Sequence, residues 1–175
     1  MNTRKSLAAV QEGCHALALA VIVILVAVAT LAGESLAADQ SENKQIIQRA
    51  FDAWASGTGS PYDLLADNVN WTITGNSLAS KSYPSKEAFI GEVIRPFNAR
   101  MSVGLKPTIR NMYSDDDTVI VFFDASGTAK DGKPYANTYA WFLDLSEGKI
   151  VKASAFFDSI AFNDLWTRLP AETVQ

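Results

Sequence analysis

The C-terminal half of the sequence contains four apolar runs separated by short polar turns, and this pattern restricts the chain to a small set of folds. The runs cover residues 105–113, 118–128, 135–145 and 149–158. Apolar side chains alternate along each run, and the turns between them are rich in Asp, Gly and Lys. Alternation is typical of strands, and connections this short join antiparallel neighbours. The pattern therefore predicts an antiparallel meander.

Helical patterns precede the meander. Residues 42–54 carry apolar side chains at helical spacing, namely Ile46, Ile47, Ala50, Phe51 and Trp54. Pro61 suits the first turn of a short second helix, and residues 69–74 alternate as a strand. A third helix is expected at about residues 85–97, divided or kinked at Pro96. Helices first and a meander last predict an α+β fold.

The apolar segment 16–32 has the features of a targeting segment and is not expected to belong to the folded domain. It carries no charge, follows a basic N-terminal region, and is followed by Ser35 and Ala37 at the small-residue positions of a signal-peptidase site. We therefore expect residues 1–37 to be an export signal and residues 38–175 to be a single periplasmic or secreted domain, with no membrane contact after cleavage. The alternative is an uncleaved inner-membrane anchor formed by residues 16–32, because its length reaches the lower limit for a span.

The amino-acid composition limits the catalytic groups and metal ligands that the expected domain can offer. The only Cys and the only His, Cys14 and His15, both lie in the expected export signal, so the remaining domain has no thiol nucleophile, no His-based triad and no Cys/His zinc site. A net charge of −4 argues against nucleic acid as a partner. No cofactor and no metal are expected, and acid–base chemistry would depend on carboxylates, Tyr or Lys.

The later strands are apolar on both faces. Val121 and Phe123 alternate with Ile120 and Phe122 along the second run. One face should cover the helices, and the second apolar face predicts a partner sheet, most simply that of a second copy in a homodimer.

The element order, together with four segments, resembles the nuclear transport factor 2-like (NTF2-like) fold, and within it the SnoaL-like polyketide cyclase and ketosteroid isomerase-like group. The segments are residues 47–54, 65–71, 132–139, and 148–151 leading into 156–159. This resemblance implies a cone in which helices and a curved antiparallel sheet enclose an apolar pocket for a small hydrophobic molecule.

Asp158 is the predicted catalytic residue. It ends the last strand, at a position that resembles the aspartate used as acid and base by cyclases of this group. In an apolar cavity, desolvation would raise the pKa of its carboxyl group and favour proton abstraction. The alternative is a structural role, because Asp158 is also well placed to cap a terminal helix that begins near Ser159.

The remaining predicted site residues are ligand-binding. Asn137, Tyr139 and Trp141 share one face of the strand 135–145, where they are suited to orient a carbonyl or hydroxyl group. The alternative interpretation of Tyr139 and Trp141, which aromatic strand residues favour, is packing in the core or at a dimer face. Three further lining residues are predicted: Trp71, Ile73 and Tyr83.

Three functions remain open at this point. The first is an exported isomerase, lyase or cyclase that acts through Asp158. The second is a binding protein that uses the same cone without catalysis, and the third is a dimeric interaction module whose pocket is filled by its own side chains.

Overall fold

A computed structural model describes residues 42–170 of the chain. The predicted export segment 1–37 lies outside the described residues. Within residues 42–170, none of the helices has the length and apolar character needed to cross a membrane.

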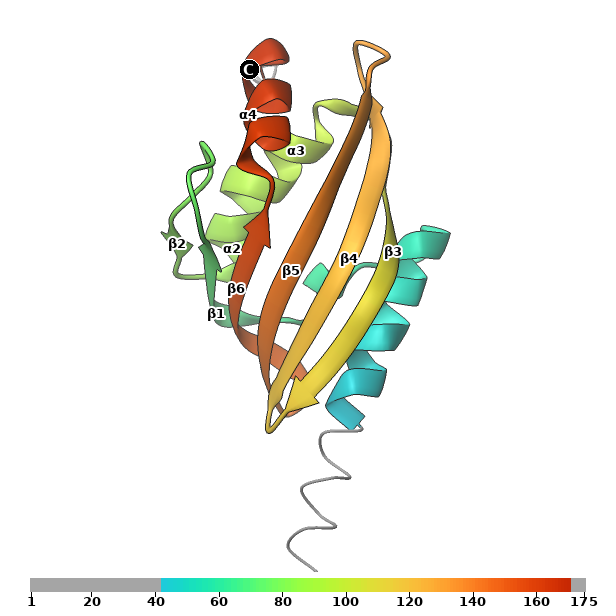
Figure 1. Ribbon diagram of the computed structural model, residues 1–175. Helices are drawn as coiled ribbons and strands as arrows, with labels where there is room; N and C mark the ends of the chain where they lie inside the picture. Colours follow the sequence, from blue (N-terminus) through green and yellow to red (C-terminus); the bar gives the residue numbers. More distant parts are fainter. Residues whose placement is uncertain (1–41, 171–175) are drawn as a thin grey trace, which may run out of the picture. The chain divides into compact units, whose positions relative to one another are not determined.

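The centre of the fold is a six-stranded sheet with the strand order β2-β1-β6-β5-β4-β3 (Figure 1). Its strands are β1 (Leu65–Ile73), β2 (Ser82–Tyr83), β3 (Met101–Asp115), β4 (Thr118–Ala129), β5 (Pro134–Ser146) and β6 (Lys149–Phe157). Strands β3 to β6 form the predicted antiparallel meander. The sheet as a whole is mixed, because β1 pairs with β6 in parallel, with Trp71 opposite Ala153.

The helices follow the sequence pattern closely. The first described helix covers residues 42–56 and ends at Gly57, whose φ of 76° is the left-handed conformation that glycine adopts without strain. A short 3-10 helix, η1 (Pro61–Leu64), begins at the proline, as predicted. The last described helix is α4 (Ser159–Arg168), which contacts β5.

The third predicted helix is divided into α2 (Lys86–Phe89), the π-helical turn η2 (Ile90–Ile94) and α3 (Arg95–Asn98). Pro96 explains the division. Its ring has no N–H and crowds the carbonyl group four residues earlier, and the preceding wide turn, in which the N–H of Arg95 reaches the carbonyl of Ile90, accommodates this.

The core lies between the inner face of the sheet and the helices. Phe51 of the first helix is fully buried, and its ring meets Phe123 of β4 edge-on at 4.9 Å between centroids. On the same face of the sheet, Phe89 of α2 stacks on Trp71 of β1. Burial of each such side chain stabilises the fold by roughly 1.5–3 kcal/mol, so helix 42–56 and α2 are held on the same face of the sheet.

The outer face of the sheet carries the second apolar surface that the sequence predicts. Phe142 of β5 is 39% exposed and Phe156 of β6 is 43% exposed, and their rings lie 5.9 Å apart. Two ion pairs flank them, Arg110 with Asp124 and Lys152 with Asp144. We call this the outer patch.

Candidate functional site

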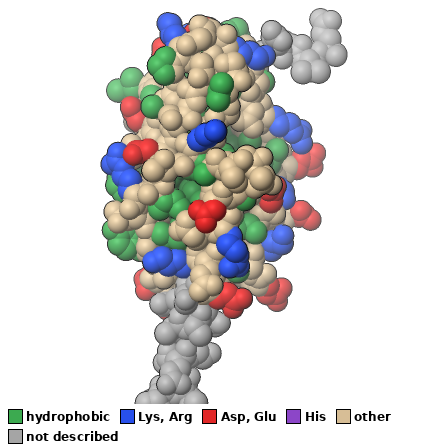
Figure 2. All heavy atoms as spheres, turned by 90° about the vertical axis from the view of Figure 1, so that its right-hand side faces the viewer, with side chains coloured by type: hydrophobic (Ala, Val, Ile, Leu, Met, Phe, Trp, Pro, Cys, Tyr) green, Lys and Arg blue, Asp and Glu red, His purple; other side chains and the backbone are tan. Residues whose placement is uncertain are grey.

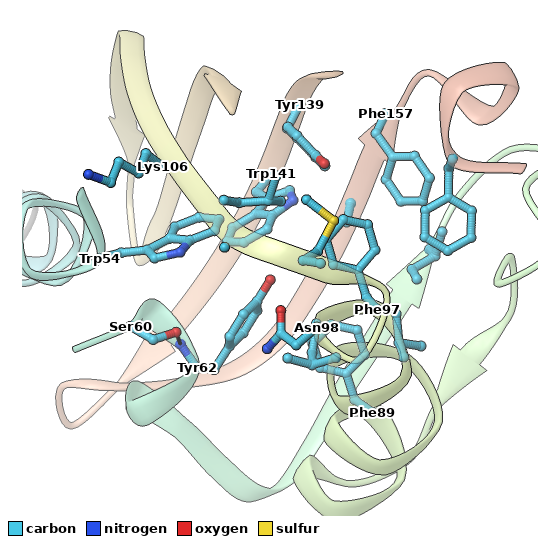
Figure 3. Close-up of a pocket in the computed structure, with 18 of the residues that line it drawn as sticks. Trp54, Ser60, Tyr62, Phe89, Phe97, Asn98, Lys106, Tyr139, Trp141 and Phe157 are labelled. Carbon is cyan, nitrogen blue, oxygen red and sulfur yellow. Dashed lines mark hydrogen bonds between the residues drawn. The ribbon is translucent and has the colours of Figure 1, made fainter. Parts of the chain in front are cut away.

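A cavity of about 490 Å³ lies between the inner face of the sheet, η1 and the helical segment 86–98 (Figure 3). We call it the central cavity. Its volume is within the range of small-molecule sites, roughly 300–1,000 Å³. Nine of its 21 described lining residues are aromatic. These aromatic side chains come from helix 42–56, η1, β1, α2, α3, β5, β6 and α4 (Ser159–Arg168). The cone implied by the resemblance is therefore present and hollow.

Stacked and perpendicular aromatic rings form the walls. Trp54 of the first helix lies nearly parallel to Trp141 of β5, at 12° and 6.0 Å between ring centroids. Trp71 stacks on Phe89 at 4.3 Å and stands at 88° to Trp141. Flat walls at right angles favour a flat guest, because aromatic rings attract each other in stacked and edge-on arrangements.

Tyr62 is placed by local capping. The Oγ of Ser60 accepts a hydrogen bond from the N–H of Tyr62 at 3.1 Å, and the carboxylate of Asp63 accepts one from the N–H of Ser60 at 2.9 Å. This fixes η1 and directs the Tyr62 hydroxyl into the central cavity (Figure 3). Burial raises the pKa of Tyr62 well above its ordinary value, so its hydroxyl stays protonated.

Tyr139 brings a second hydroxyl to the central cavity from β5 (Figure 3). Its side chain is only 8% exposed, and burial raises its pKa well above the ordinary value. The Tyr139 hydroxyl lies 3.3 Å from that of Tyr135, which in turn accepts a hydrogen bond from Nδ2 of Asn137 at 3.0 Å. The hydroxyl of Tyr139 is thus the member of this hydrogen-bonded series of Asn137, Tyr135 and Tyr139 that reaches the cavity.

The start of β3 forms the mouth of the central cavity. Its pairing with β4 shifts register twice between Met101 and Lys106, so this segment bulges away from a regular ladder. Gly127 of β4 permits the bulge, because a Cβ there would lie 2.6 Å from the carbonyl oxygen of Val103. On this side of the molecule, hydrophobic side chains are exposed at the surface among charged ones (Figure 2). Lys106 is the charged residue among the described lining residues.

Asp158 lies outside the central cavity, so the expectation that its carboxylate enters an apolar pocket is wrong. The side chain is exposed and caps α4, accepting a hydrogen bond from the N–H of Ile160 at 2.8 Å. It borders a separate, shallow hollow with Lys106 and Thr138. Capping explains the displacement: the chain must turn at Asp158 to begin α4, and this turn carries the carboxylate out of the sheet.

The other predicted site residues divide into three groups. Trp71, Ile73, Tyr139 and Trp141 line the central cavity, and their role in ligand binding stays a prediction. Asn137 is buried behind Tyr135 and does not line this cavity. Tyr83 is a packing residue: it is 2% exposed, its hydroxyl donates to the carbonyl oxygen of Ala79 at 2.7 Å, and burial, with the negative charge of Glu92, raises its pKa to about 12.

Several lining residues were not predicted from the sequence, including Tyr62, Phe89, Phe97 and Phe157. Tyr62 carried a usable signal, because it follows Pro61 within the cap sequence Ser-Pro-Tyr-Asp. Phe89 and Phe97 carried none, because a helix that covers a hollow sheet has the same apolar spacing as one that covers a filled core. Phe157 lies on β6 two residues after the lining residue Ala155, so strand alternation could have indicated it.

The described lining residues give the central cavity an apolar, aromatic character with hydroxyl groups and no carboxylate, and its one charged lining residue is Lys106 at the mouth. Within residues 42–170, His, Cys, Asp and Glu side chains form no cluster suited to a metal ion. The arrangement is suited to enclosing an apolar molecule and to hydrogen bonding with it.

Comparison with known proteins agrees with this geometry. The sequence profile of the SnoaL-like domain matches residues 47–153. No curated protein matches the chain significantly in sequence. A protein from a soil-derived mobile gene cassette superposes with a TM-score of 0.60 at 19% identity, covering 73% of this chain and 98% of its own.

Two further solved structures show the same fold. An NTF2-like protein from Burkholderia thailandensis is 22% identical, with a TM-score of 0.58, and covers 70% of this chain and 95% of its own. A protein named as a SnoaL-like polyketide cyclase from Jannaschia is 18% identical, with a TM-score of 0.56, and covers 75% and 95%. Identities this low establish the fold alone. The family profile covers more than half of the sequence, and the chain belongs to the SnoaL-like domain family of the NTF2-like superfamily.

Proposed function

We propose that this domain binds one small, flat, uncharged hydrophobic molecule in the central cavity. The observation that carries the proposal is the cavity of about 490 Å³ with walls of Trp54, Trp71 and Trp141 and no carboxylate among its described lining residues. Burial of an apolar guest is favourable by about 25 cal/mol per Å² of apolar surface removed from water.

The same observation favours binding over proton transfer. The SnoaL-like cyclase of Jannaschia and an epoxide hydrolase-like protein of M. tuberculosis share this fold. In this chain, however, the ionisable groups among the described lining residues are Lys106 at the mouth and the hydroxyls of Tyr62 and Tyr139, whose pKa values burial raises. Protonated hydroxyls donate hydrogen bonds but do not abstract protons at neutral pH. Acid–base chemistry by Asp158 would require its carboxylate to leave the α4 cap.

A titration with fluorene, an uncharged flat hydrocarbon, tests the proposal. We expect saturable binding, followed by quenching of tryptophan fluorescence or by calorimetry. Ala155 lines the cavity and is 2% exposed, so Ala155→Leu should fill space and weaken binding strongly. Asp158→Asn is the matched control and should leave affinity unchanged. Absence of saturable binding, or equal binding by Ala155→Leu, would contradict the proposal.

We further propose that the outer patch pairs with a second copy of this chain. Phe142 and Phe156 offer an apolar centre, and the flanking ion pairs present charges of both signs. A symmetric dimer buries the same surface on both copies, which suits an apolar centre surrounded by charges of both signs.

Export is likewise proposed from the sequence. Residues 16–32 and the small residues Ser35 and Ala37 support a cleaved signal. Intact-mass measurement of the expressed protein tests this: a mass that begins at Ala38 supports export, and a mass that retains residues 1–37 supports the anchor.

A further inference from the structure

We propose that Tyr139 donates a hydrogen bond to an acceptor oxygen of the ligand. Asn137 determines that Tyr139 is the donor, because it donates to the hydroxyl of Tyr135 and so leaves that hydroxyl to donate to Tyr139. The inference rests on the proposed binding function. It assigns the ligand to a chemical class, namely flat hydrophobic molecules that carry a carbonyl or a similar acceptor deep in the cavity.

The side-chain amide of Asn137 is fixed at both its oxygen and its nitrogen. Its Oδ1 accepts a hydrogen bond from the N–H of Asp158 at 2.9 Å, and its Nδ2 donates to the carbonyl oxygen of Asp158 at 3.0 Å. The reversed amide would bring two acceptors together and two donors together. Nδ2 therefore also donates to the hydroxyl oxygen of Tyr135, at 3.0 Å.

The hydroxyl of Tyr135 accepts from Asn137 and must therefore donate its own proton elsewhere. Its side chain is 3% exposed, and its oxygen already accepts from Asn137. The hydroxyl proton of Tyr135 needs an acceptor, and among the described residues the oxygen of Tyr139, 3.3 Å away, is the one within reach. This distance is longer than the usual hydroxyl–hydroxyl hydrogen bond, whose oxygen atoms lie about 2.5–3.0 Å apart. The alternative order would bury the Tyr135 proton without a partner.

The proton of Tyr139 is then directed into the central cavity. Its hydroxyl is occupied as an acceptor by Tyr135, it has no other hydrogen bond to the described residues, and it faces the cavity interior (Figure 3). An unpaired donor in an apolar site costs free energy that an acceptor oxygen on the ligand recovers. A ligand that offers only a donor at this point leaves two protons facing each other.

Other polar groups at the cavity do not select one type of ligand atom in this way. The side-chain amide of Asn98 carries both a donor and an acceptor, and Lys106 lies at the mouth (Figure 3). The indole N–H of Trp71 has no acceptor among residues 42–170, but it is sealed from the cavity space. Tyr62 presents a hydroxyl that no described neighbour orients, so it can donate or accept. The hydroxyl proton of Tyr139, which points into the cavity, is thus the feature that selects ligands with an acceptor oxygen.

Fluorene and 9-fluorenone test the inference, because they share a tricyclic shape and differ by one acceptor oxygen. In Tyr139→Phe we expect fluorenone affinity to fall about tenfold while fluorene affinity stays within about twofold. Tyr62→Phe is the matched control, since it removes a cavity hydroxyl that nothing orients, and it should change the ratio of the two affinities much less. Measuring both probes separates a lost hydrogen bond from a disturbed fold, which would weaken both.

Tyr135→Phe tests the direction. It frees the oxygen of Tyr139 to accept, so 9-fluorenol should gain affinity relative to fluorenone in this variant. The inference is overturned if Tyr139→Phe changes fluorene and fluorenone equally, or if Tyr135→Phe leaves the ratio of fluorenol to fluorenone affinity unchanged. Fluorene binding without fluorenone binding overturns the inference alone, and failure of both probes overturns the proposed function as well.

Discussion

The carboxylate of Asp158 accepts a hydrogen bond from the backbone N–H of Ile160 at 2.8 Å, and this contact begins α4. The same residue holds Asn137 through its backbone N–H and carbonyl groups. Asp158 is therefore joined to the central cavity through its backbone, while its carboxylate points into a solvent-exposed cap.

A pair of substitutions at Asp158 tests this structural role. Asp158→Ala should lower the free energy of unfolding by about 1 kcal/mol, because the cap is lost, whereas Asp158→Asn should be nearly neutral, because Asn caps equally well. Urea denaturation measures both. Equal destabilisation by Ala and Asn would show that charge, and not capping, is what matters at this position.

The close approach of β3 to Gly127 gives a second prediction. Gly127→Ala should destabilise the protein by about 1–3 kcal/mol and weaken fluorene binding, because the added Cβ would lie 2.6 Å from the backbone oxygen of Val103 and would displace the mouth of the cavity. Thermal denaturation and the fluorene titration measure the two effects.

Gly104→Ala is the control for that substitution. It lies in the same bulged segment, but a Cβ there meets nothing within 4 Å. Its stability should stay within about 0.5 kcal/mol of the wild type. If the two variants behave alike, the tight contact at Gly127 does not shape the mouth.

The buried tyrosines predict a loss of stability at high pH. The pKa of Tyr83 is raised from an ordinary 10.0 to about 12. Between these values the unfolded chain releases the proton and the folded chain retains it, so the free energy of unfolding falls as the pH rises from 10 to 12. Urea midpoints should fall less steeply in Tyr83→Phe. An identical slope in the variant would contradict the assignment.

The same reasoning predicts that ligand binding is independent of pH near neutrality. The hydroxyls of Tyr62 and Tyr139 remain protonated because burial raises their pKa values. Fluorenone affinity should therefore be constant between about pH 6 and pH 9. A titration midpoint inside that interval would point to an ionisable group that takes part in binding.

The outer patch gives a prediction about assembly. Phe142→Asp places a charge in the apolar centre of the proposed dimer contact and should convert dimer to monomer in analytical ultracentrifugation. Tyr113→Asp, at an exposed position nearer the sheet edge, is the matched control and should dissociate the dimer less. A wild-type protein that sediments as a monomer would contradict the proposal outright.

The sequence predicted the fold because its strands and helices differ in period. Alternation along 118–128 and 135–145 and the turn residues between them define the meander, and Pro96 correctly marked the divided helix. Trp71, Ile73, Tyr139 and Trp141 line the cavity, and alternation along their strands indicates that face, whereas their binding of a ligand stays a prediction.

The errors arose where a position depends on how one element meets another. The cap at Asp158 turns its carboxylate outward, and a strand pattern cannot show where the strand ends. The parallel pairing of β1 with β6 joins segments far apart in the chain. Tyr83 is used for packing because its hydroxyl finds the carbonyl of Ala79 inside the loop before α2.

A crystal structure of the protein with 9-fluorenone bound tests the central claim most directly. The account predicts the tricyclic ring inside the central cavity, between the walls of Trp71 and Trp141, with its oxygen at hydrogen-bonding distance from the hydroxyl of Tyr139. A saturated crystal in which this cavity is empty, with the probe on the outer patch or beside Asp158, would contradict it.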